Sequence, residues 1–264
     1  MISKAVTVIV RRQSPDWSNI NDAFWLQLTE FERFMGRPPG GIRELIELWN
    51  RTFSESFFNI RNKMKLITDA NLNRVSKAKI IDLDRYRANM RASSESRHEV
   101  YAFTDDDDWF SPELACIGSA INEDCDGVVW RSARFDGSLQ ARAMDGYCYT
   151  NNYAIFGRAL VSRPDLVMEV EQHGGASRLA TTGFLRLKRI DKILSITNKH
   201  PCSTVALERA VKEWAGKGGL RMWLNDVKER LKHPPDLEGM DVAWARPEIE
   251  AFNDLIGGLG TKAL

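Results

Sequence analysis

Four consecutive aspartates, Asp105 to Asp108, stand within "FTDDDDWFSPE" (103–113), directly after an apolar run. Carboxylates held this close repel one another, and burying any of them without a partner costs free energy. Such a run is therefore either solvated by water, or it holds a cation together with an anionic ligand. The second case points to Mg²⁺ or Mn²⁺, because these hard cations prefer oxygen ligands.

The residues in and after the acidic run can be compared with the motifs of three kinds of metal-dependent protein. A calcium EF-hand loop that begins at Asp105 needs glycine at 110 and glutamate at 116, but Phe110 and Cys116 stand there, which excludes it. A phosphatase that forms an aspartyl-phosphate wants a small or hydroxyl residue where Trp109 stands, which weakens that hypothesis. A nuclease with paired carboxylates needs acids from other strands, and the sequence defines no such set.

The elements around the run follow from apolar patterning. Asn19 or Asn21 can cap a first helix, and a second amphipathic segment begins at Ile42. Short apolar or β-branched runs predict strands at 5–10, 63–68, 78–83, 99–104, 126–135 and 192–197. Strands interleaved with helical segments predict an α/β fold with a mostly parallel sheet flanked by helices. Ligands of such sheets lie beyond the carboxyl ends of the strands, which is where the four aspartates fall.

The last quarter of the chain has a different pattern. From about Ser203 onward it is helical, with an apolar stripe that includes Leu207, Val211 and Trp214. No clean linker precedes it, so we expect one α/β domain over 1–202 and a helical C-terminal appendage over 203–264 packed on the same domain. The stripe favours core packing or a homodimer interface.

The strand that runs into "FTDDDDWFSPE" resembles the glycosyltransferases of the GT-A fold, in particular family-2-like and rhamnosyltransferase-like members. Their signature is a strand followed by Asp-x-Asp or Asp-x-Asp-Asp, an aromatic residue and a proline that starts a helix. The matching positions are Asp105, Asp107, Asp108, Trp109 and Pro112, with Asp106 at the variable position. The resemblance covers roughly residues 5–200, although only 103–113 is specific, and "VRRQSPDW" departs from the usual loop after the first strand.

The resemblance implies a Rossmann-like domain that transfers a sugar from a nucleotide-diphosphate donor to a hydroxyl acceptor, on a glycan or a lipid-linked molecule. It implies that Asp105 reaches the ribose, that Asp107 holds Mn²⁺ or Mg²⁺ and that Asp108 supports them. The cation would neutralise the leaving diphosphate. Further metal ligands are expected at His200, in "SITNKHPCST", or at His173, in "EQHGGASR".

Glycosyl transfer with inversion also needs a carboxylate base for the acceptor hydroxyl, and Glu171 and Asp145 are the candidates. A retaining enzyme needs no such base, so the stereochemistry stays open. The basic segment 61–97 can supply cations for the diphosphate, and we select Arg61 and Arg97 as donor-binding candidates.

Composition limits the remaining choices. The net charge of +1 gives no general attraction to nucleic acid or to an anionic membrane. The four cysteines, Cys116, Cys125, Cys148 and Cys202, are too widely spaced for a zinc ribbon and indicate buried thiols in a reducing compartment. The N-terminal apolar run precedes its arginines, the reverse of a signal peptide. These features predict a soluble cytoplasmic protein with no transmembrane segment, and they leave peripheral membrane contact open.

Two other functions stay open. A non-catalytic protein of the same fold could bind a nucleotide sugar or a partner at the acidic edge, and a metal-dependent phosphohydrolase would use the same carboxylates.

Overall fold

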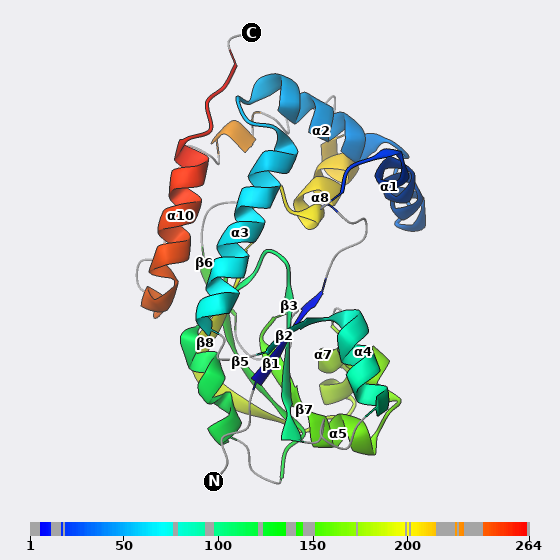
Figure 1. The fold of residues 1–264 in the computed structure, drawn as a ribbon, viewed down its shortest axis with the longest axis vertical. Coiled ribbons are helices and arrows are strands. Elements are labelled where there is room, and N and C mark those ends of the chain that lie inside the picture. Colours follow the sequence, from blue (N-terminus) through cyan, green and yellow to red (C-terminus); the bar gives the residue numbers. More distant parts are fainter. Residues whose placement is uncertain are drawn as a thin grey trace.

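The chain forms one mixed β-sheet with helices on both faces and a further group of helices beyond it (Figure 1). The structure is a computed structural model. It describes residues 6–11, 17, 19–75, 79–92, 98–120, 124–135, 141–144, 151–172, 174–198, 200, 202–214, 225, 227–229 and 240–262.

The sheet has eight strands in the described part of the chain, in the order β2-β1-β3-β7-β5-β8-β4, with β6 paired to β5. The strands are β1 Val6–Arg11, β2 Lys79–Asp82, β3 Val100–Asp105, β4 Trp109–Phe110, β5 Gly127–Phe135, β6 Ala141–Met144, β7 Tyr153–Phe156 and β8 Leu187–Asn198.

The sheet is α/β as expected, but its strands are parallel only in part. β1 is parallel to both β2 and β3, and β5 is parallel to β8, whereas the pairs of β7 with β3 and β5, β4 with β8 and β6 with β5 are antiparallel. Parallel pairing needs a long crossover, usually a helix, and the described residues between β5 and β7 contain none. The chain therefore returns beside β5 in the opposite direction.

The helices lie on the faces of this sheet and beyond it, and they include the two 3₁₀ helices η2 and η3. They are α1 Asp22–Phe34, α2 Gly41–Thr52, α3 Phe57–Val75, α4 Leu83–Ala92, η2 Pro112–Ala120, α5 Gly157–Ser162, α6 Leu166–Val170, α7 Gly175–Thr181, α8 Thr204–Trp214, η3 Ala243–Ala245 and α10 Arg246–Gly257. The predicted cap of α1 is confirmed, because Oδ1 of Asn21 accepts a hydrogen bond from the backbone N–H of Phe24 at 3.0 Å.

One predicted strand is wrong. The segment 63–68 lies inside α3, a helix of 19 residues that runs along the upper part of the sheet in Figure 1. Its buried residues include Ile60, Met64, Thr68 and Leu72, which recur every four positions along the helix. Within 63–68 alone, Met64 and Leu66 alternate with two lysines, which is typical of a strand, and the helical period is not visible.

The helices from the two ends of the chain share one apolar core. α8 packs on α2, and α10 packs on α3. Leu207 and Val211 of α8 are buried in this core together with Ile42 and Trp49 of α2. The C-terminal stripe therefore packs within the chain at these positions. None of the described helices is long and apolar enough to cross a membrane.

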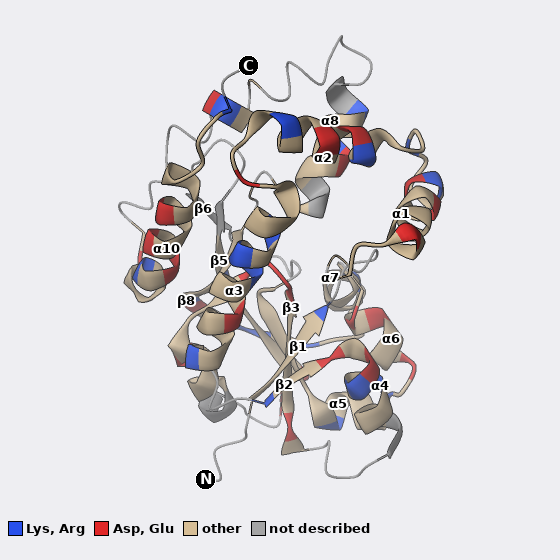
Figure 2. Cartoon of the chain, turned by 45° about the horizontal axis from the view of Figure 1, so that its top comes forward, with Lys and Arg blue, Asp and Glu red and all other residues tan. Residues whose placement is uncertain are grey.

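Each face of the sheet has its own apolar cluster. One contains Leu72 and Val75 of α3 together with Leu114 of η2. The other contains Tyr86 of α4 and Leu160 of α5. Lys, Arg, Asp and Glu are interspersed on the outer surfaces of α2, α8 and α10 (Figure 2). The edge of the sheet at the carboxyl ends of β1, β2 and β3 lies between α3 and α4, and this edge carries the candidate site.

Candidate functional site

The acidic run forms a turn at the carboxyl end of β3. Strand β3 is buried along its whole length, and Asp105 is its last residue. β3 runs parallel to β1, with Asp105 opposite Arg11, and β4 begins at Trp109. The turn is therefore fixed between two strands of the sheet.

Two of the four aspartates hold the turn in place. The side chain of Asp105 is 2% exposed, and its Oδ1 lies 3.2 Å from Nε of Arg11. Oδ1 of Asp108 accepts a hydrogen bond from the backbone N–H of Asn198 at 2.9 Å, which ties the turn to the end of β8. Nη1 of Arg11 also donates to the backbone oxygen of Glu171 at 3.3 Å. These contacts connect the turn to β1, β8 and the segment after α6.

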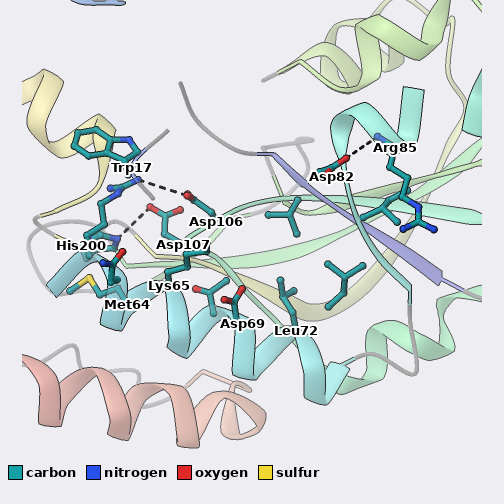
Figure 3. A pocket seen from close by; sticks show the side chains of 16 residues that line it. Trp17, Met64, Lys65, Asp69, Leu72, Asp82, Arg85, Asp106, Asp107 and His200 are labelled. Carbon is teal, nitrogen blue, oxygen red and sulfur yellow. Dashed lines mark hydrogen bonds and ion pairs between the residues drawn. The ribbon is translucent and has the colours of Figure 1, made fainter. Parts of the chain in front are cut away.

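The other two aspartates, Asp106 and Asp107, face a pocket of about 270 Å³. Oδ2 of Asp106 lies 3.9 Å from Nη2 of Arg61, and Oδ2 of Asp107 lies 3.5 Å from Nε2 of His200 (Figure 3). Burial and, next, the negative charge of Asp107 raise the pKa of Asp106 to about 6, although the Arg61 guanidinium opposes both effects. Asp106, which sequence patterning assigns to a spacer position, thus shares the pocket with Asp107.

The pocket lies between α3 and the ends of the three parallel strands, and its two ends differ in character. Trp17, Asp106, Asp107 and His200 lie at one end in Figure 3, while Asp82 and Arg85 lie at the other. Apolar and polar side chains of β1, β2 and α3 line the space between them. The lining residues are Val10, Trp17, Arg61, Asn62, Met64, Lys65, Thr68, Asp69, Leu72, Ile80, Ile81, Asp82, Arg85, Asp106, Asp107 and His200.

Three buried polar atoms of this lining have no hydrogen-bond partner among the described residues: Nε1 of Trp17, Oγ1 of Thr68 and Oδ1 of Asp106. The indole N–H can only donate, the carboxylate oxygen of ionised Asp106 can only accept, and the hydroxyl can do both. Leaving such atoms without a partner costs roughly 1–3 kcal/mol each.

The structure brings some of the predicted site residues together and separates others. His200, Asp107 and Arg61 line one pocket, while Asp105 and Asp108 hold the turn from outside that lining. Asp145, His173 and Arg97 lie outside the residues that the structure describes.

Glu171, the other candidate base, is 5% exposed and is bound by Arg87 of α4. Nε of Arg87 donates to Oε1 at 3.1 Å and to Oε2 at 3.0 Å. The hydrogen bond to Glu171 raises the pKa of the Arg87 guanidinium. Glu171 is absent from the described lining of the pocket. Its carboxylate therefore joins α4 to the segment after α6.

The fit of a divalent cation depends on the donors available near Asp107. Among the described residues, no group of three or more His, Cys, Asp or Glu side chains could hold a metal ion. A Mg²⁺ site that uses one carboxylate together with substrate phosphates needs no such group, because the substrate supplies the other oxygen ligands. Asp107 faces the pocket and suits that arrangement.

Several residues that line the pocket belong to no motif that the sequence analysis identified. Thr68 and Lys65 reach the pocket only because 63–68 is helical, and Trp17 reaches it from the segment after β1. Asp82 ends β2 and accepts a hydrogen bond from the backbone N–H of Arg85 at 2.8 Å, as a helix cap does. A polar residue at the end of a strand beside the acidic strand is the signal that could have found Asp82.

Comparison with known proteins gives no assignment: no family model, no curated protein and no solved structure matches this chain. Function is therefore argued from the geometry of the pocket.

Proposed function

We propose that this protein is a glycosyltransferase that moves a sugar from a nucleotide-diphosphate donor to a hydroxyl acceptor on a glycan or lipid-linked molecule. The observation that carries the proposal is the pocket at the carboxyl ends of β1, β2 and β3, which Asp106 and Asp107 face from the same turn. Ligands of α/β sheets bind at this edge. The resemblance of 103–113 to the GT-A signature supports the same function.

The chemistry of the lining suits a nucleotide. Val10, Ile81 and Leu72 offer apolar surface to a planar base, while Thr68 and Asp106 add polar side chains to the lining. The volume of about 270 Å³ is near the lower end of the roughly 300–1,000 Å³ range of small-molecule pockets. It therefore suits the nucleoside part of the donor, with the rest of the donor extending past Asp107.

Asp107 is the residue that would hold Mg²⁺ or Mn²⁺, with phosphate oxygens of the donor and water as the remaining ligands. When bound, the ion would neutralise charge on the leaving diphosphate. Asp105 and Asp108 keep the turn fixed through Arg11 and Asn198, so the carboxylate of Asp107 has little freedom to move. This rigidity is what a site needs in order to place a cation reproducibly.

Replacement of Asp107 tests the proposal. We expect Asp107→Ala to lower donor turnover by about 100-fold or more, while the thermal unfolding midpoint stays close to that of the parent protein. The assay uses a panel of UDP-, GDP- and dTDP-sugars with Mn²⁺. Asp69→Ala is the matched control, because Asp69 is an exposed aspartate on the rim of the same pocket. Full activity of Asp107→Ala would contradict the proposal.

A non-catalytic nucleotide-sugar-binding protein is the second candidate. It is favoured by Glu171, whose carboxylate oxygens are both bound by Arg87 instead of facing the pocket. The same donor panel separates the functions. Binding that is measured by calorimetry without any turnover indicates the binding protein, and release of phosphate without sugar transfer indicates a phosphohydrolase.

A further inference from the structure

Arg61 is the most constrained cation of the pocket. It belongs to α3 and is 7% exposed. Its Nη1 donates to the backbone oxygen of Cys202 at 2.6 Å, and its guanidinium lies 4.5 Å from the ring centroid of Trp17. Nη2 lies 3.9 Å from Oδ2 of Asp106. Hydrogen bonding, stacking and charge thus fix one planar group in one orientation.

The backbone around Cys202 is held by two side chains. Its oxygen accepts from Arg61, and its N–H donates to Nδ1 of His200 at 3.1 Å. Cys202 is fully buried, so neither backbone group can turn to water instead. Arg61 and the imidazole are therefore coupled through the backbone of a single residue.

The hydrogen bond at Nδ1 decides where His200 carries its proton. A ring nitrogen that accepts a hydrogen bond has no proton of its own, so a single proton on this imidazole stands on Nε2. Nε2 lies 3.5 Å from Oδ2 of Asp107. His200 thus presents an N–H, not a lone pair, to the carboxylate. A nitrogen that carries a proton cannot bind a metal ion.

We propose that His200 is a positioning residue that directs its Nε2–H toward Asp107, and that Arg61 fixes this orientation through the backbone of Cys202. His200 is then not a metal ligand, because its Nε2 carries a proton. The functional consequence rests on the proposed function, because it assumes that Asp107 serves the donor. The position of the proton on His200 does not rest on it.

The first test is the tautomer of His200 in the folded protein. Two-dimensional ¹H–¹⁵N spectra of protein labelled with ¹⁵N-histidine distinguish a proton on Nε2 from a proton on Nδ1, and His200→Gln identifies the signals. We expect the Nε2–H tautomer in the free protein and again after addition of Mg²⁺ and UDP. An Nδ1–H tautomer in the free protein, or a change to it when Mg²⁺ and UDP are added, would overturn the proposal. The result for the free protein stands even if UDP does not bind.

The second test separates Arg61 from a neighbouring cation. Lys65 lines the same pocket one helical turn further along α3, and among the described residues it is Arg61 that bonds the backbone oxygen of Cys202. Arg61→Lys should disturb the His200 tautomer signals and lower donor turnover by about tenfold, the usual size of an effect that acts through a supporting residue. Lys65→Gln should leave the His200 signals unchanged.

The spectra test the coupling between Arg61 and His200 even if the protein has no glycosyltransferase activity. Unchanged His200 signals in folded Arg61→Lys protein would contradict the coupling, whatever the activity. Disturbed signals without any donor turnover in the parent protein would uphold the coupling and reject the glycosyltransferase. If Arg61→Lys does not fold, the spectra of the parent protein still decide the tautomer.

Discussion

The two flanks of the acidic turn use the same residue types in different settings. On one flank, Arg11 lies 3.2 Å from Asp105, and the two side chains are 5% and 2% exposed. On the other flank, Arg61 lies 3.9 Å from Asp106, which is 21% exposed and lines the pocket. The first pair is closed inside the protein, and the second opens onto a space that a ligand can fill.

The difference shows how one turn can be held rigidly on one side and line a pocket on the other. A close buried pair needs its partner, because removing one member leaves an uncompensated charge in a region of low dielectric constant. The looser pair leaves Oδ1 of Asp106 without a hydrogen-bond partner among the described residues, and burial raises the pKa of this carboxyl group. The closed flank thus determines the shape of the turn, while the open flank lines the pocket.

The largest effect is expected from breaking the closed flank. Arg11→Met removes the cation beside Asp105 but keeps an apolar stem, so the free energy of unfolding should fall by about 3–5 kcal/mol. Urea denaturation followed by far-ultraviolet circular dichroism measures this change. The reason is the charge left on Asp105, which is buried at the end of β3.

A double variant is the control for this effect. Adding Asp105→Asn to Arg11→Met removes the stranded charge as well, so part of the lost stability should return. A fall of less than about 1 kcal/mol in Arg11→Met alone would show that the two flanks do not differ as the burial of their side chains indicates.

A smaller effect with a distinct pH dependence is expected on the open flank. The folded state raises the pKa of Asp106 from its unfolded value near 3.8 to about 6, so it favours the protonated carboxyl group. The stability that this protonation contributes is fully present below about pH 3.8 and is lost as the pH rises through about 6. Asp106→Asn carries no titrating group there. The difference in free energy of unfolding, Asp106→Asn minus parent, should therefore be about 1–3 kcal/mol larger at pH 7 than at pH 4.

Denaturant titrations at pH 4, 5, 6 and 7 measure this difference. The control is Asp69→Asn on the exposed rim of the pocket, for which we expect a change within about 0.5 kcal/mol at each pH. A difference between Asp106→Asn and the parent that does not vary with pH would contradict the raised pKa of this group.

The position of the site could be predicted from the sequence because strand ends are local features. The runs at 5–10, 78–83 and 99–104 are β-branched or apolar and bounded by polar residues, and β1, β2 and β3 lie there. Once these strands are parallel neighbours, the aspartates after β3 must lie at their common carboxyl edge. The strand β7 and its antiparallel pairing with β3 could not be predicted in the same way.

The roles within the acidic run could not be predicted, because they depend on residues that are distant in the sequence. Asp105 faces Arg11, which is 94 positions earlier, and Asp108 binds the backbone of Asn198. Thr68 reaches the pocket only because Met64 and its neighbours belong to a helix and not to a strand. A short apolar window does not distinguish these two periods, and only packing against the sheet selects between them.

The smallest effect is expected on the closed flank, at Glu171. Glu171→Gln removes the negative charge that Arg87 binds through both carboxylate oxygens. Because Arg87 is 35% exposed, water can solvate its guanidinium in the variant. We therefore expect a loss of about 1–2 kcal/mol in the free energy of unfolding. Donor turnover should stay within about twofold of the parent, because the carboxylate faces Arg87.

Glu169→Gln is the matched control, since Glu169 forms a more exposed pair with Arg178 and should change stability by less than about 0.5 kcal/mol. A fall of about 100-fold in kcat of Glu171→Gln at unchanged KM would instead identify Glu171 as the general base. The catalytic group would then lie on the side of the turn that Arg11 occupies, and not on the side of Arg61.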